Sequence, residues 1–173
     1  NIEEVAESLQ DVGISALTIH ARTRSQMYKG HSDWSYIAKV KNNPRIHIPI
    51  FGNGDIDNPE QALEYRNKYG VDGIMIGRAA IGYPWIFREI KHYFATGELL
   101  SPPTIADRVA AARNHLIWSV EWKGERQGVL EMRRHYANYF KGLPNFKEHR
   151  QRLVTLDSAA EIVTALEEIV AKY

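Results

Sequence analysis

Three groups of polar residues stand where apolar runs of the sequence end, and their types suit an anionic ligand. His20 closes one run, residues 53–55 (Asn-Gly-Asp) follow a second, and residues 77–78 (Gly-Arg) follow a third. Glycines let backbone N–H groups approach a phosphate closely, and a guanidinium can bind a phosphate through two parallel hydrogen bonds.

Each group also has an ordinary structural explanation. A single histidine at a strand end is more often structural, a Gly-Asn-Gly-Asp sequence more often forms a tight turn, and one arginine most often makes a surface ion pair. Together the three groups favour a binding site, because each follows a predicted strand of one parallel sheet. Ligands of such sheets bind at the carboxyl ends of the strands, so we expect one shared anionic-ligand site.

The elements that must position these groups alternate between helix and strand. Apolar spacing and turn residues predict strands at 14–20, 46–51 and 73–76, and helices at 2–9, 34–40, 59–70 and 85–95. This alternation is typical of parallel βα units, and the unbroken apolar strands favour a sheet covered on both faces. Three strands cannot close a βα barrel, which needs eight strands and about 250 residues. The region is either a small open sheet or the last part of a barrel.

Beyond a Ser-Pro-Pro break at 101–103 the pattern is helical only. Helices are predicted from Thr104 to Gly124, at about 126–140, at about 146–153, and from Asp157 or Ser158 to Val170. Four such helices favour a bundle. We therefore expect two domains, residues 1–100 and residues 101–173.

The second region carries a basic segment with interleaved aromatic residues. Residues 104–156 hold 10 lysines and arginines against 5 acidic residues. Basic groups with aromatic rings suit RNA, although aromatic residues at helical spacing usually serve a core and the charge can be a solvated face. The candidate RNA contacts, including two arginines after the first strand, are Arg22, Arg24, Arg133, Arg134, Lys147, Arg150 and Arg152.

The composition excludes several kinds of protein and site. The 173 residues carry a formal net charge of +1, with 44% hydrophobic and 25% charged residues, as in ordinary soluble globular proteins. No cysteine is present, which excludes disulfides and thiolate chemistry within these residues. No long apolar run, leader peptide or metal-ligand spacing is visible. We expect no membrane contact, no metal and a cytoplasmic location.

Four sequence blocks together resemble the tRNA-dihydrouridine synthases, and most of all their bacterial B subgroup. The blocks occur in the family's order over nearly the whole chain. They are HARTR at 20–24 with QMYKG at 26–30 and DW at 33–34, GNGDI at 52–56, DGIMIGRAA at 72–80 with GYPWIF at 82–87, and RRH at 133–135 with Tyr139 and KGLP at 141–144.

The resemblance implies an enzyme that reduces specific uridines of tRNA to 5,6-dihydrouridine with FMN, which NADPH re-reduces. It implies a (βα)8 TIM barrel, of which the three strands would be about strands six to eight, followed by a helical tRNA-binding domain. The residues that match the family's FMN-binding positions are His20, Asn53, Gly54, Asp55, Gly77 and Arg78.

One departure from the family concerns the catalytic acid. The family's acid is a cysteine in the first half of the barrel, and this chain has none. The chain begins with an asparagine and is helical almost at once, so we expect a C-terminal fragment that is inactive alone and can associate through an exposed sheet edge.

Two other functions remain open. One is an FMN-dependent barrel oxidoreductase that acts on a free small molecule, such as a relative of dihydroorotate dehydrogenase. The other, for the fragment alone, is a non-catalytic RNA-binding module.

Overall fold

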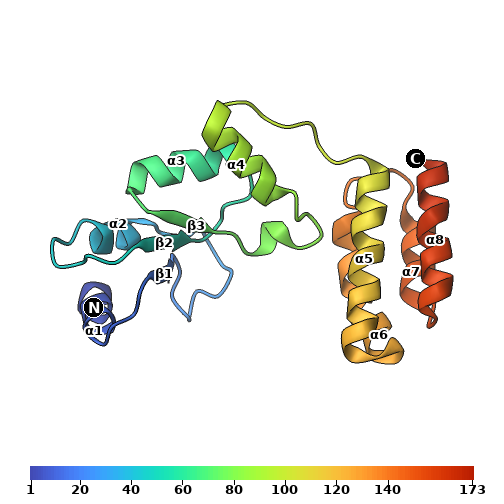
Figure 1. The fold of residues 1–173 in the computed structure, drawn as a ribbon, viewed down its shortest axis with the longest axis horizontal. Helices are drawn as coiled ribbons and strands as arrows, with labels where there is room; N and C mark the ends of the chain where they lie inside the picture. Colours follow the sequence, from blue (N-terminus) through green and yellow to red (C-terminus); the bar gives the residue numbers. More distant parts are fainter. The chain divides into compact units, whose positions relative to one another are not determined.

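The computed structural model describes the whole chain, residues 1–173, with eight α-helices, three β-strands and one short 3-10 helix. The chain forms two compact units. The first comprises Asn1–Ala80 and Ile86–Leu100, and the second comprises Ile81–Trp85 and Ser101–Tyr173. Figure 1 shows the strands with α1 to α4 in the first unit and the helices α5 to α8 in the second.

A parallel sheet organises the first unit and confirms the α/β class. Its strands β1 (Leu17–His20), β2 (Ile50–Asn53) and β3 (Gly73–Met75) lie in the order β1-β2-β3. The register sets His20 opposite Asn53, and Asn53 opposite Met75. All three strands therefore end at one edge, beside the polar groups that follow them in sequence.

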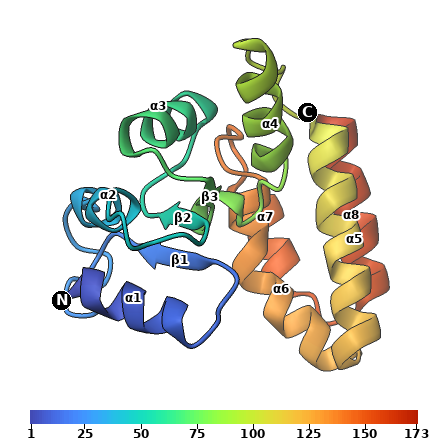
Figure 2. The ribbon, with the colours of Figure 1, turned by 60° about the vertical axis from the view of Figure 1, so that its left-hand side comes forward.

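Two helices connect these strands, one helix precedes them, and a 3-10 turn and a fourth helix follow them. They are α1 (Ile2–Asp11), α2 (Ser35–Lys41), α3 (Pro59–Tyr69), η1 (Arg78–Ala80) and α4 (Ile86–Thr96). Figure 2 shows α1, α2 and α3 next to one another in chain order beside the strands. Helix α3 begins as its sequence predicts, because the Asn58 side chain accepts a hydrogen bond from the Gln61 N–H at 2.8 Å and proline occupies the first turn.

The sheet is covered on one face only, which corrects the expectation of two covered faces. Ile19 and Gly52 are opposite each other and buried, and the indole of Trp34 packs directly on Gly52. The opposite face, which carries His20 and Met75, is exposed at this edge.

The strand boundaries also differ from the predictions. Strand β2 begins at Ile50, after Pro49, and continues through Gly52 and Asn53, which the sequence suggested as a turn. Ladder pairing to both neighbouring strands holds these two residues extended. Strand β1 is shorter than predicted, because pairing starts only at Leu17.

The second unit is a group of four helices, α5 (Ile105–Lys123), α6 (Glu125–Tyr139), α7 (Lys147–Thr155) and α8 (Ala159–Lys172). A capping box between Thr104 and Asp107 starts α5. The buried core of the unit includes Leu116, Met132 and Leu166 from three different helices. This four-helix arrangement agrees with the pattern read from the sequence.

No helix is long and apolar enough to cross a membrane. No group of three or more His, Asp or Glu side chains is arranged to hold a metal ion.

Candidate cofactor-binding site

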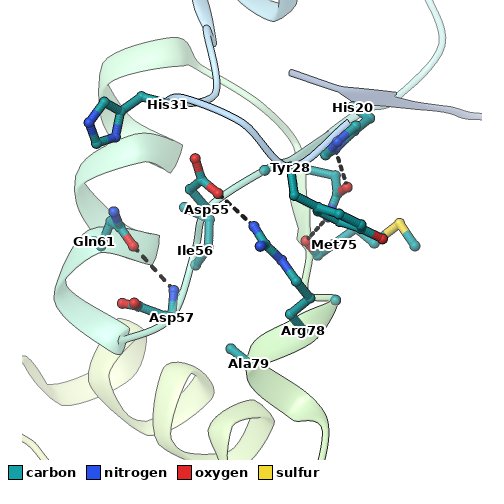
Figure 3. A pocket seen from close by; sticks show the side chains of 13 residues that line it. His20, Tyr28, His31, Asp55, Ile56, Asp57, Gln61, Met75, Arg78 and Ala79 are labelled. Atoms are coloured by element: carbon teal, nitrogen blue, oxygen red, sulfur yellow. Dashed lines mark hydrogen bonds and ion pairs between the residues drawn. The ribbon is translucent and has the colours of Figure 1, made fainter. Parts of the chain in front are cut away.

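A cavity of about 700 Å³ opens at the carboxyl edge of the sheet (Figure 3). Its volume falls in the range of small-molecule and cofactor sites. The six residues that the sequence resemblance assigns to FMN all line it, namely His20, Asn53, Gly54, Asp55, Gly77 and Arg78. The other lining residues are Tyr28, His31, Ile56, Asp57, Gln61, Met75 and Ala79.

Asn53 joins the ends of all three strands. Its side-chain amide donates a hydrogen bond to the Met75 carbonyl at 2.7 Å, and its Oδ1 lies 2.7 Å from Nδ1 of His20. Because the amide oxygen can only accept, His20 carries its proton on Nδ1. In the neutral imidazole, Nε2 is then an acceptor at the cavity wall.

Asp55 forms ion pairs with two arginines, Arg22 and Arg78. Its carboxylate accepts hydrogen bonds from Arg22 at 2.6 and 2.8 Å, from Arg78 at 2.9 Å and from the Ser32 N–H at 2.8 Å. The hydrogen bond from Arg22 is the main cause that lowers the Asp55 pKa to about 2, against an opposing effect of burial. The carboxylate is therefore ionised at neutral pH, and its role towards an anion is to position arginine.

Arg78 presents its guanidinium to the cavity. The side chain is 55% exposed, pairs with Asp55 and lies over the Tyr28 ring, with 4.8 Å between the guanidinium carbon and the ring centroid. These contacts hold the charge in place but leave further N–H donors for a ligand. The charges of Arg22, Asp55 and Arg78 sum to one positive charge, which suits a phosphate.

Gly77 leaves space at the same wall. A Cβ atom built on Gly77 would meet no atom within 4 Å, although the residue lines the cavity. Gly54 is different, because its φ is +140° and a Cβ there would lie 2.9 Å from that of Ser32. No contact within the protein therefore requires glycine at position 77, whereas the backbone conformation itself favours glycine at position 54.

Arg22 is buried, which contradicts its selection as a candidate RNA contact. Its side chain is only 2% exposed, and it also donates a hydrogen bond of 2.7 Å to the Gly30 carbonyl. Arg22 therefore holds Asp55 and the loop that follows β1. Arg24, two residues later, is exposed and makes no ion pair.

The five candidate RNA contacts of the second unit fall into two groups. Arg133 binds the Leu156 carbonyl at 3.2 Å and Asp157 at 2.6 Å, and Arg152 pairs with Glu168. Both are engaged within the unit. The other three, Arg134, Lys147 and Arg150, are exposed, and only Arg134 has an acidic neighbour, Glu131 at 3.8 Å.

Sequence reasoning missed the contributions of Tyr28, His31 and Gln61 to the cavity. An aromatic residue in a polar loop after a strand was the available signal for Tyr28. The pairing of Arg22 with Asp55 joins residues 33 positions apart, and no local pattern indicates it.

Comparison with known proteins gives one consistent result. The dihydrouridine synthase family model matches residues 1–172. The chain is 40% identical to the "Probable tRNA-dihydrouridine synthase 1" of Synechocystis over 99% of this chain and 47% of the relative. It is 43% identical to the "tRNA-dihydrouridine synthase B" of Xanthomonas campestris over 84% of this chain and 43% of the relative, and 40% identical to that of Proteus vulgaris over 96% and 51%.

The chain thus spans about half the length of the curated relatives it matches. The family model nevertheless matches every residue of this chain except the last. The chain belongs to the dihydrouridine synthase family.

Proposed function

We propose that the complete protein reduces specific uridines of tRNA to 5,6-dihydrouridine, with FMN as cofactor and NADPH as reductant. Family membership supports the reaction class. The single observation that carries the cofactor assignment is the cavity wall formed by Gly77 and Arg78, where a positioned guanidinium lies beside unfilled space.

The residues present fit the phosphate end of a flavin nucleotide. Arg78 would donate charge-assisted hydrogen bonds to the phosphate, and Gly77 would let the phosphate approach the backbone. Asp55 would position Arg78, and Asn53 would orient His20 against the flavin. Bound flavin supplies the hydride for the reduction.

The proton donor and the rest of the flavin cavity would come from residues outside this chain. The absence of cysteine and the half-length match to the relatives support this division. We propose that β1 to β3 are about strands six to eight of a TIM barrel. The exposed sheet face beside His20 is then the surface that further residues would cover. Alone, the chain should be inactive.

The helical region, residues 101–173, is proposed to bind tRNA in the cytoplasm. Among the candidate contacts, Arg134, Lys147 and Arg150 of this region are exposed and available for phosphates, as is Arg24 in the loop after β1. Arg133 and Arg152 would contribute only where their ion pairs still allow a contact. The target uridine must leave its stack to reach a flavin.

One rival function is the reduction of a free small molecule by a similar flavin site. It would use the same phosphate wall but would not need the exposed cations of the helical unit. The other rival is an RNA-binding module without chemistry, which would need no flavin.

The test is an assay of the complete protein with NADPH and tRNA that lacks dihydrouridine. We expect yellow protein with flavin absorbance and dihydrouridine in the product tRNA. Free uridine and orotate serve as substrate controls. Protein without flavin, or turnover of the free compounds only, would contradict the proposal.

A further inference from the structure

Helices α5 and α6 approach each other unusually closely. A Cβ atom built on Gly128 would lie 2.7 Å from backbone atoms of Val120, and Ser119 donates a hydrogen bond of 3.3 Å to the Gly128 carbonyl. Only glycine permits this spacing. The close approach brings one face of each helix into a common wall.

A cavity of about 480 Å³ lies along this wall, apart from the site beside the sheet. Two tryptophans four residues apart on α5 line it, and both are exposed: Trp118 by 65% and Trp122 by 86%. Indole rings are rarely left this open on a soluble protein, and neighbouring exposed aromatic rings mark interaction sites. The remaining lining residues are His115, Ser119, Lys123, Glu131, Met132, Arg134 and His135.

The cavity carries positive charge next to its aromatic rings. Arg134 is 72% exposed, and Lys123 is paired with Glu131. The charges of Arg134, Lys123 and Glu131 therefore sum to one positive charge. Nε of Arg134 donates to Nε2 of His135 at 3.2 Å, which requires an unprotonated acceptor. Burial is the main cause that lowers the pKa of His135, as it does for His115. The wall thus offers cations, neutral imidazoles and open indole faces.

We propose that this cavity binds unpaired nucleotides of an RNA strand, with bases stacked on Trp118 and Trp122 and a phosphate bound by Arg134. Base stacking on aromatic side chains together with cations is the usual way in which proteins hold single-stranded RNA. A protein partner would not require the exposed cation beside both indoles. The choice of RNA over other nucleotide ligands rests on the proposed tRNA substrate.

The test titrates the complete protein with an eight-nucleotide single-stranded oligouridylate and follows tryptophan fluorescence. Stacking should quench the fluorescence, and Trp122→Ala should weaken binding about 5- to 150-fold, the usual loss per stacked base. Trp122→Phe should retain most of the affinity. Leu130→Ala on α6, at a side chain that is 41% exposed and outside the cavity, is the matched control. Equal affinity of Trp122→Ala and wild type would overturn the proposal.

Arg134 provides an independent arm of the same test. The logarithm of the oligonucleotide binding constant falls linearly with the logarithm of the salt concentration. Arg134→Gln should make this slope less steep by about 0.7, the value for one phosphate contact on a single strand. Arg113→Gln, at an exposed residue of α5 outside the cavity, should leave the salt dependence unchanged.

Three further ligands distinguish the source of the nucleotide. Inorganic polyphosphate should not quench the fluorescence, and blunt duplex RNA should bind more weakly than the single strand. Saturation by free NADPH at lower concentration than by RNA would overturn the assignment to RNA, and so would a complete lack of response to every RNA.

The outcome is separable from that of the proposed enzymatic function. If tRNA is reduced but Trp122→Ala binds oligouridylate normally, only the nucleotide site is wrong. If oligouridylate binds at the tryptophans but no dihydrouridine forms, only the proposed reaction is wrong.

Discussion

Nδ1 of His20 donates a hydrogen bond of 2.7 Å to Oδ1 of Asn53. The same amide group donates to the Met75 carbonyl, so its orientation is fixed from the other side. One side chain therefore sets both the tautomer of a cavity histidine and the alignment of three strand ends. This arrangement supports a site whose polar groups are positioned before any ligand arrives.

Replacing Asn53 tests that arrangement. Asn53→Ala removes two hydrogen bonds and should destabilise the fold by roughly 1–3 kcal/mol. ¹⁵N NMR of the imidazoles above pH 8 should show His20 with its proton on Nδ1 in the wild type and a mixture of tautomers in the variant. An unchanged His20 spectrum would refute the role assigned to Asn53.

Asp55 should make stability depend on pH in the acid range. Its folded-state pKa of about 2 lies below the ordinary 3.8, so the ionised carboxylate stabilises the fold above about pH 4. That contribution, about 2 kcal/mol, is lost as the pH falls towards 2. Thermal unfolding of wild type and Asp55→Asn should differ at pH 7 and converge near pH 2. Asp57→Asn, at an exposed carboxylate without an ion pair, should leave the wild-type profile unchanged.

The two cavity glycines should respond in opposite ways to substitution. Gly77→Ala places a methyl group in open space, so the melting temperature should stay within about one degree while flavin binding by the complete protein falls. Gly54→Ala should lower stability by roughly 1–3 kcal/mol, because its backbone conformation is strained for alanine. Full flavin content in Gly77→Ala would contradict the phosphate position.

The sequence predicted the helices, the parallel strands and the gathering of His20, Asn53 and Arg78 at one edge. These features follow from local periodicity and from the geometry of βα units. The shared carboxylate of Asp55 was not predictable, because it depends on Arg22 being folded back into the loop after β1. For the same reason the sequence wrongly indicates Arg22 as a candidate RNA contact. Local charge counts say nothing about which arginine is buried.

Arg133 and Arg134 are adjacent in sequence but should behave differently. Arg133 is bound to Leu156 and Asp157, so Arg133→Ala should lower the melting temperature. Arg134→Ala should keep the stability of the wild type, because exposed arginines contribute little. It should instead reduce the salt slope of tRNA binding by about 0.7 to 0.9. Thermal unfolding and tRNA titration on the same preparations check both variants. A loss of stability in Arg134→Ala but not in Arg133→Ala would contradict the contacts.

Arg78 tests the central claim most directly, namely that this cavity holds the phosphate of a flavin nucleotide. The measurement is the FMN dissociation constant of the complete protein, for wild type and Arg78→Ala, with tRNA affinity as the internal control. Loss of a charge-assisted contact of roughly 1.5–3 kcal/mol predicts an FMN affinity about 10- to 150-fold weaker, with tRNA affinity unchanged. Equal FMN affinity in the two proteins would contradict the account, because a surface ion pair alone predicts almost no effect.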